Sequence, residues 1–270
     1  MLLLDGEELV GAKQNRIINL TILVEAHSTT VIPVSCVEQG RWRSESKSFA
    51  ATRRTHFATG RARKASRVTE SLQHSGTRRS NQGEIWNDIE EKMARMKVST
   101  PTSAAAAMYE QKRHDLDRYL EAFTPADNQT GALFAINGKA VGLDLFDSTK
   151  PLNTMLSGLV QSYALDAIDQ FDGKTGETPA PTETAVSLLA DCAAATITGF
   201  PALGAGHDLR LQGAKVTGGA LALEERIIHL CAFRPAPENQ TGRSRHGGRI
   251  TRSSVRRQRP YFNPGDDIIY

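Results

Sequence analysis

Residues 2–16 read LLLDGEELVGAKQNR, and the rest of the chain is best interpreted outward from this stretch. Its apolar run stops at Asp5, polar and charged residues follow as far as Arg16, and apolar alternation resumes over 17–24. A second polar cluster, SCVEQGRW at 35–42, closes the next alternating segment. Alternation with a period of two is typical of β-strands. Because antiparallel strands return the chain to the same end of a sheet, we expect the two polar clusters to meet there and form the candidate site.

The composition is that of a folded protein with one main domain. Its 270 residues are 39% hydrophobic, which is enough for a core, and we place the domain at 1–234. Cys36, Cys192 and Cys231 are widely spaced and form no C-x-x-C pair, which argues against a disulfide framework or a zinc ribbon. No apolar run approaches the roughly 18 residues of a membrane span. We therefore expect a cytoplasmic protein without a membrane segment.

The formal net charge of +3 hides an uneven distribution of charge. Residues 43–83 carry ten Lys or Arg and two Glu, residues 234–259 carry eight Arg and one Glu, and the remainder therefore carries −12. Basic segments with few apolar residues are typical of solvated chain. We predict a basic mobile loop or lid at 43–83 and a basic disordered tail at 235–270. These segments either hold the acidic remainder by charge or bind phosphate-bearing partners.

The remaining pattern predicts an α+β fold, in which antiparallel sheets pack against several helices. Asn137-Gly138 predicts a hairpin at 131–146, because this pair supplies the positive φ of a type I′ turn. Pro33 has no N–H to donate, so its strand, 29–37, is expected at a sheet edge or at a bulge. The other expected elements are helices at 84–97, 103–123, 151–170 and 184–196, and strands at 16–24, 209–211, 216–223 and 226–233.

Three carboxylates of the first polar cluster, Asp5, Glu7 and Glu8, are candidates for catalysis or metal binding. Mg²⁺ takes one or two protein carboxylates together with substrate phosphates, so a glycine-flanked acidic turn suits it. The alternative is a polar connector, in which Asp5 accepts local backbone hydrogen bonds and Glu7 or Glu8 pairs with Lys13 or Arg16.

In the second polar cluster, Glu38 is the candidate general base, or a partner that orients water in a hydrolytic site. Cys36 is a weaker candidate for a nucleophile, because its thiol would need a nearby cation such as Arg41 and no histidine base lies beside it. A free cysteine in a strand is more often a small buried hydrophobe. The catalytic roles are therefore assigned to Glu7, Glu8 and Glu38.

Basic and amide side chains of both clusters are the candidates for ligand binding. Lys13, Arg16 and Arg41 match phosphate oxygens, arginine in bidentate fashion and lysine as a point charge. Surface ion pairing is the alternative explanation for these cations. Directional hydrogen bonds and a stacking surface would come from Gln14, Asn15 and Trp42, the last of which could equally anchor the core.

Further patterns indicate weaker sites. His229 and Cys231 lie two residues apart, on one face of a strand, and could begin a metal site, but no second pair completes it, so a satisfied core or rim histidine is the favoured interpretation. Asp144, near a strand-to-helix junction, is a weak site candidate. The tail combines arginines with Tyr261 and Phe262, as single-strand binders do, so nucleic acid is an alternative partner whose affinity would fall steeply with salt.

Five segments together resemble the ARPP-1 family: LLLDGEELVGAKQNR from Leu2, IPVSCVEQGRW from Ile32, SNQGEIW from Ser80, RLQGAKVTGGAL from Arg210 and HLCAF from His229. The family name stands for ADP-ribosylglycohydrolase and rhodanese-phosphatase-superfamily-associated protein. The resemblance covers residues 2–233 and implies a cytoplasmic protein that binds or processes a nucleotide-linked ligand of the ADP-ribose or NAD class. Relatives usually extend further before the first strand, so this chain could lack the first strands of the family fold.

Two other hypotheses remain open from the sequence. One is a non-catalytic interaction module, whose basic lid and tail bind acidic partners or nucleic acid. The other is a degraded relative without activity. A ligand site requires residues 5–16 and 35–42 to converge, whereas an interaction module needs only surface charge.

Overall fold

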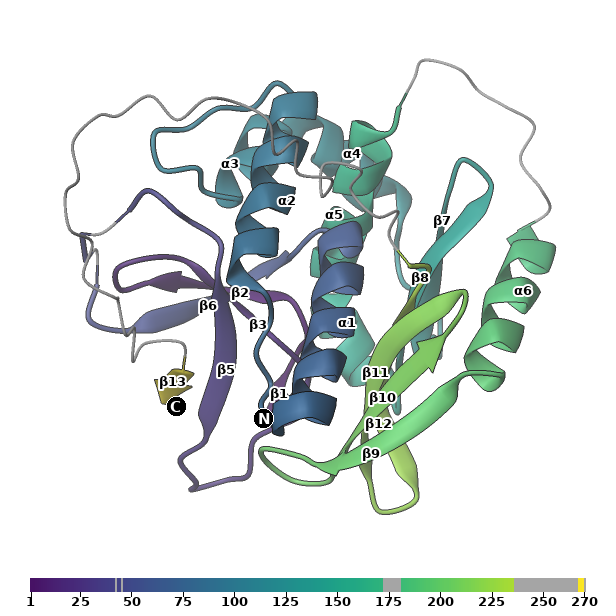
Figure 1. Cartoon of the computed structure of the whole chain (residues 1–270). Coiled ribbons are helices and arrows are strands. Elements are labelled where there is room, and N and C mark those ends of the chain that lie inside the picture. The colour runs from purple at the N-terminus through teal and green to yellow at the C-terminus, as the bar shows by residue number, and fades with distance from the viewer. Residues whose placement is uncertain (42, 45, 172–180, 236–266, 270) are drawn as a thin grey trace, which may run out of the picture.

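The computed structural model describes residues 1–41, 43–44, 46–171, 181–235 and 267–269. A central helix, α1, lies between two antiparallel sheets, and further helices pack above it and on the outside of the larger sheet (Figure 1). This arrangement is an α+β fold, as predicted from the sequence.

The smaller sheet comes mostly from the amino-terminal part of the chain and has the strand order β13-β5-β3-β2-β6. The predicted strand at 16–24 is interrupted, since β3 pairs with β5 whereas β4 pairs with β1 in a separate two-stranded sheet. Asn19 and Thr21 lie in the interruption, where their side chains bond to distant segments. The strands are β1 (Leu2–Leu3), β2 (Glu7–Gly11), β3 (Arg16–Ile18), β4 (Ile22–Leu23), β5 (Val31–Cys36), β6 (Phe49–Thr55) and β13 (Asp267–Ile269).

The larger sheet has the order β7-β8-β12-β11-β10-β9. Its hairpin is the predicted one, because Asn137 (φ 50°) and Gly138 (φ 73°) join the first two strands. The edge strand β9 was not expected from the sequence, and its mostly exposed residues explain why it lacks apolar alternation. The strands are β7 (Gly131–Ile136), β8 (Lys139–Phe146), β9 (Thr196–Pro201), β10 (His207–Gly213), β11 (Val216–Leu223) and β12 (Arg226–Phe233).

The predicted mobile lid at 43–83 is wrong for most of its length. Residues 49–55 form β6, and residues 58–75 form the 18-residue helix α1. Arg61 and Lys64 of α1 are fully buried between the two sheets. Their charges are neutralised by acidic residues of the sheets, so this basic segment orders instead of remaining solvated.

The other helices follow the predicted positions, apart from one break. The predicted helix at 103–123 is divided at Lys112 into two. The helices are α1 (Ala58–Ser75), α2 (Gln82–Arg95), α3 (Ala106–Gln111), α4 (Arg113–Ala122), α5 (Thr149–Asp169) and α6 (Pro181–Ala193).

The apolar core lies in separate clusters on the faces of the two sheets. One cluster joins Ile17 and Val37 of the smaller sheet to α2, α3 and α5 through residues such as Ile89, Met108 and Leu165. On the outside of the larger sheet, Leu188 of α6 packs against its apolar residues (Figure 1). The first cluster fixes α3 against the strands that carry the candidate site.

The tail lies mainly outside the described residues, which omit 236–266 and 270. Asp267–Ile269 is described, and it pairs antiparallel with Val31–Pro33 of β5. The expectation of a tail without structure is therefore wrong for these three residues. Across the described ranges, the longest and most apolar helices fall short of what is needed to cross a membrane.

Candidate functional site

The two polar clusters converge, as the candidate site requires. The Asn15 backbone N–H donates to Glu38 Oε2 at 3.2 Å, and Arg41 Nε donates to the same oxygen at 2.7 Å. Arg41 Nη2 also donates to Asn15 Oδ1 at 2.9 Å. These contacts use the carboxylate of Glu38 and the guanidinium of Arg41 to fasten one loop to the other. These contacts shape the site, and the base and phosphate roles of Glu38 and Arg41 stay predictions.

Gln14 and Cys36 form a second link between the clusters. The Cys36 thiol donates to Gln14 Oε1 at 3.0 Å, and Gln14 Nε2 lies 3.5 Å from the Gln39 carbonyl. Burial raises the pKa of the Cys36 thiol, more than the nearby charge of Arg16 lowers it. A thiol held in its protonated form is a poor nucleophile, so Cys36 acts here as a buried packing residue.

Two predicted ligand-binding cations lie at the rim of this site. Lys13 is exposed and Arg16 is half-buried. Within the described part of the chain, neither side chain has a hydrogen bond or an ion pair to another residue. Trp42, the predicted stacking surface, lies outside the described residues.

The three carboxylates of the first cluster point to three different places. Asp5 bonds to cations of α1, Glu7 Oε2 accepts the Leu4 N–H at 3.1 Å, and Glu8 turns toward β6. Burial raises the pKa of Glu7, although its hydrogen bond from Leu4 lowers it in part. Glu7 and Glu8 are successive residues of β2 and therefore face opposite sides, and Asp5 is held by cations of α1, so the three carboxylates are not gathered around a shared Mg²⁺ position. Across the described ranges, no three His, Cys, Asp or Glu residues are grouped to hold a metal.

Glu8 is a buried carboxylate whose ion-pair partner, Arg54, is partly exposed at the surface. It is 3% exposed, lies 3.6 Å from Arg54 Nη1 and accepts a 3.4 Å hydrogen bond from Thr52. Burial raises its pKa from 4.5 to about 6, against the opposing effects of Arg54 and Thr52, while the charges of Glu110 and Glu38 raise it further. A small cavity of about 10 Å³ adjoins it, lined by Glu8, Ile17, Val37, Arg54, Thr55, His56, Ala105 and Tyr109.

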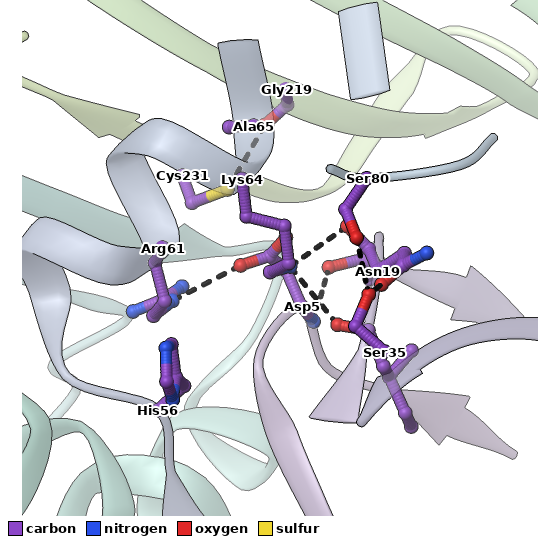
Figure 2. A network of polar contacts seen from close by, with 12 residues as sticks. Asp5, Asn19, Ser35, His56, Arg61, Lys64, Ala65, Ser80, Gly219 and Cys231 are labelled. Carbon is purple, nitrogen blue, oxygen red and sulfur yellow. Dashed lines mark hydrogen bonds and ion pairs between the residues drawn. The ribbon is translucent and has the colours of Figure 1, made fainter. Parts of the chain in front are cut away.

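A second set of charged residues lies deep between the two sheets. Lys64 Nζ donates to Asp5 Oδ2 at 2.7 Å and to the carbonyls of Ile18 and Asn19 at 3.0 and 2.8 Å. Both Lys64 and Arg61 of α1 reach Asp5 (Figure 2). All three donors of the Lys64 ammonium are therefore used.

Pro33 explains why a lysine is needed at this point. Asn19 directly follows β3 and lies opposite Pro33 of β5. The Asn19 N–H donates to the Pro33 carbonyl at 3.0 Å. A residue other than proline would return a bond to the Asn19 carbonyl. Lys64 Nζ supplies that bond instead. The strand that contains Pro33, β5, lies between β3 and β13, so the prediction of a sheet edge is wrong. The side chain of Lys64 donates the ladder hydrogen bond that Pro33 cannot donate.

Arg61 extends the buried network to the larger sheet. It donates to Asp5 Oδ1 at 3.1 Å and to both oxygens of Asp144 at 3.1 and 2.6 Å. His229 Nε2 lies 3.2 Å from Asp144, and its Nδ1 lies 2.9 Å from the Thr21 hydroxyl. Burial raises the pKa values of Asp5 and Asp144, but the nearby cations outweigh it and both values are lowered.

The buried network joins the parts of the fold and has no opening for a ligand. Asp5, Arg61, Lys64, Asp144 and His229 are each at most 3% exposed, and the two carboxylates balance the two cations. His229 is a buried histidine with both ring nitrogens bonded, to Asp144 and to Thr21, which agrees with the interpretation favoured from the sequence. The Cys231 thiol lies 3.6 Å from the Gly219 carbonyl.

A family model described as ARG and Rhodanese-Phosphatase-superfamily-associated Protein domain matches residues 1–233. The chain belongs to the ARPP-1 family. No curated protein and no solved structure matches the chain significantly.

Several ARPP-1 motifs meet in the buried network. Asp5 comes from the first motif and His229 from the last, and the Ser35 hydroxyl of the second bonds to that of Ser80 in the third (Figure 2). Ser35 also donates to Asn19 Oδ1 at 2.6 Å. These motif residues therefore hold this fold together, and Glu8 lies outside their network, beside the partly exposed Arg54.

The sequence did not reveal the partners of Glu8 in this ARPP-1 protein. Arg54 lies in FAATRRT, which shows no apolar alternation, and Tyr109 lies in an alanine-rich helix. Tyr109 reaches the site by donating to the Thr55 carbonyl at 2.6 Å. No local pattern links these segments to Glu8, because the contacts span 46 residues or more of chain.

Proposed function

We propose that this ARPP-1 protein binds and hydrolyses an anionic, nucleotide-linked ligand of the ADP-ribose or NAD class, with Glu8 as the general acid–base. The observation that carries the proposal is a buried carboxyl with a pKa of about 6 beside a partly exposed arginine. A group that titrates near neutral pH holds and releases protons efficiently, which is the requirement for acid–base catalysis.

Three cations of the smaller sheet and its loops support an anionic ligand. Arg54 is partly exposed, and Lys13 and Arg16 have no side-chain partner among the described residues. Arginine binds phosphate oxygens through two parallel N–H groups, and lysine adds a point charge. The ADP-ribose class is favoured because the family name associates ARPP-1 with ADP-ribosylglycohydrolase.

The other predicted catalytic residues take supporting positions in this proposal. Glu38 holds Arg41 and the Asn15 backbone, and its charge also raises the pKa of Glu8. Glu7 closes the turn at Leu4. Substitution of Glu38 or Glu7 should then lower activity through loss of structure, whereas Glu8→Gln should remove activity from a folded protein.

Calorimetric titration with ADP-ribose and with NAD, in Mg²⁺ and in chelator and at two salt concentrations, tests the ligand. Saturable binding that weakens in Lys13→Ala and Arg16→Ala supports the proposal, with Lys150→Ala, an exposed lysine at the start of α5, as the control. Glu8→Gln should retain binding and lose turnover. Absence of heat with both ligands, from a protein that melts cooperatively, would overturn the proposal.

A second proposal concerns the basic tail. The charged residues of 43–83 are largely used inside the protein, as Arg61, Lys64 and the Arg67 pairs with Glu70 and Glu84 show. The arginines that follow residue 235 therefore remain the basic segment for a nucleic-acid partner. Replacement of the arginines of 243–259 by glutamine, which leaves β13 in place, should abolish binding of a single-stranded oligonucleotide and its salt dependence while ADP-ribose binding persists.

A further inference from the structure

Arg54 occupies a bridging position between the buried Glu8 and the surface. Its Nη1 lies 3.6 Å from Glu8 Oε2, and its Nη2 lies 3.4 Å from Oε1 of Glu110 on α3. The side chains of Glu8, Arg54 and Glu110 are 4%, 30% and 63% exposed, so the guanidinium lies between the inner carboxylate and solvent. It also lies 5.8 Å from the centre of the Tyr109 ring, within cation–π range.

The space behind Arg54 is too small for a ligand. The cavity that Glu8 and Arg54 line measures about 10 Å³. One water molecule needs roughly 10–15 Å³. A phosphate-bearing ligand therefore meets Arg54 from the surface, where the guanidinium is 30% exposed.

The groups around Glu8 show which contact can change. Thr52 and Arg54 face it from β6, Tyr109 and Glu110 belong to α3, and Glu38 acts from the loop after β5. His56, on the cavity wall, carries no charge near neutral pH, because burial and neighbouring cations lower its pKa to about 3. Of these groups, Arg54 is the cation, and it is held to Glu8 by an ion pair longer than a hydrogen bond.

We propose that Arg54 is a positioning residue that couples anion binding to protonation of Glu8. A phosphate group of the ligand offers two oxygens to the guanidinium and draws it from the carboxylate. Glu8, left buried without a cation, takes one proton from solvent. This inference rests on the proposed function and adds the event, anion binding at Arg54, that protonates Glu8 before hydrolysis.

The proton balance of the hydrolytic step follows. When the bond to the leaving group breaks, its electron pair stays with the leaving group, which takes the proton from Glu8. A water molecule supplies hydroxyl to the other fragment, and the remaining proton of that water passes to the regenerated Glu8 carboxylate. Release of the anion returns Arg54 to Glu8, and the proton returns to solvent.

The test is a titration of Glu8 followed by NMR of ¹³C-carboxyl-labelled glutamate, with the signal assigned by its absence in Glu8→Gln. Arg54→Met should raise the midpoint by about one pH unit, because loss of a nearby opposite charge shifts a carboxyl by roughly 1–3 units. Arg53→Met, its exposed neighbour on β6, should leave the midpoint unchanged. Arg54→Lys keeps the charge and should stay near the wild-type value.

The anion arm uses sulfate and ADP-ribose, neither of which titrates near pH 6. Saturating anion should raise the midpoint in the wild-type protein and not in Arg54→Met. ADP-ribose binding without movement of the midpoint would overturn the coupling and leave the proposed function standing. Failure of ADP-ribose to bind, with a midpoint that sulfate still raises, would overturn the ligand class and support the coupling. No movement with either anion would overturn the inference.

Discussion

At the scale of single residues, the number of cations beside a buried carboxylate decides its chemistry. Asp5 and Glu8 are both almost fully buried and lie three positions apart. Asp5 touches Lys64 at 2.7 Å and Arg61 at 3.1 Å, and its pKa is lowered. Glu8 has Arg54 at 3.6 Å, and its pKa is raised to about 6. One residue is therefore a permanent structural anion, and the other can exchange a proton near neutral pH.

Glu8→Gln should make the protein more stable at pH 7.5 and change little at pH 4. The folded pKa of about 6 exceeds the ordinary value of 4.5, so the carboxyl stabilises the fold below pH 4.5 and loses that contribution as pH rises through 6. The difference corresponds to about 2 kcal/mol at 1.36 kcal/mol per pH unit. Urea unfolding at both pH values measures it, and a gain independent of pH would contradict the assignment.

Lys64→Met should destabilise the protein by about 3–5 kcal/mol, the usual result of removing one partner of a buried ion pair. The substitution removes a cation from Asp5 and leaves the Asn19 carbonyl without its donor, while the Ile18 carbonyl keeps its bond from the Gly6 N–H. Lys13→Met, at an exposed position, is the control and should change the free energy of unfolding by at most about 0.5 kcal/mol. Equal effects in the two variants would show that the Lys64 network contributes nothing.

At the scale of elements, a proline in one strand and a lysine in a helix form a matched pair. Pro33 of β5 leaves one ladder acceptor open, and Lys64 of α1 fills it from outside the sheet. The sequence indicates that Pro33 disturbs a ladder, because its missing N–H is a local property. It does not indicate that α1 supplies the replacement.

Pro33→Val should therefore behave differently in two backgrounds. In Lys64→Met the new N–H can bond to the Asn19 carbonyl and should recover about 1 kcal/mol. In the wild-type background Lys64 already occupies that carbonyl, so no gain is expected. A double-mutant cycle from urea unfolding measures the coupling. Additive effects would mean that the two donors do not compete.

The hairpin of β7 and β8 is determined locally. Gly138 has a φ of 73°, so Gly138→Ala should cost about 1 kcal/mol or more. Gly83 in α2 is the matched control, because a Cβ there would meet only Asn81 Oδ1 at 3.5 Å. Gly83→Ala should stabilise by about 0.4–1 kcal/mol. Thermal melts of both variants test whether alanine destabilises the protein at a glycine with positive φ and stabilises it at a helical glycine.

At the scale of the whole molecule, α1 and its charges bind the two sheets into one body (Figure 1). Arg61 touches Asp5, beside the smaller sheet, and Asp144 of the larger sheet. Lys92 of α2 makes a parallel link to Asp166 and Asp169 of α5. Since these ion pairs cross between elements, the sheets should unfold together.

Arg61→Met should lower the stability of both sheets at once, by about 3–5 kcal/mol. Hydrogen exchange reads the two sheets separately, and amides of β3 and β8 should accelerate by similar factors. Arg67→Met, on the exposed face of the same helix, is the control. Faster exchange confined to one sheet would show that the sheets open independently.

The sequence by itself determined the α+β class, the Asn137-Gly138 hairpin, most helices and closing strands, and the convergence of the two polar clusters. Periodicity and turn residues report the local backbone and the buried face of each element, so these features follow from neighbours along the chain. Only the tertiary structure decided which charges are buried together. The contact of Arg61 with Asp144 spans 83 residues, and that of Thr21 with His229 spans 208. Pairing at such separations depends on how the sheets and helices pack. This packing explains why the segment predicted as a basic lid forms the central helix, and why Glu8 is buried beside Arg54.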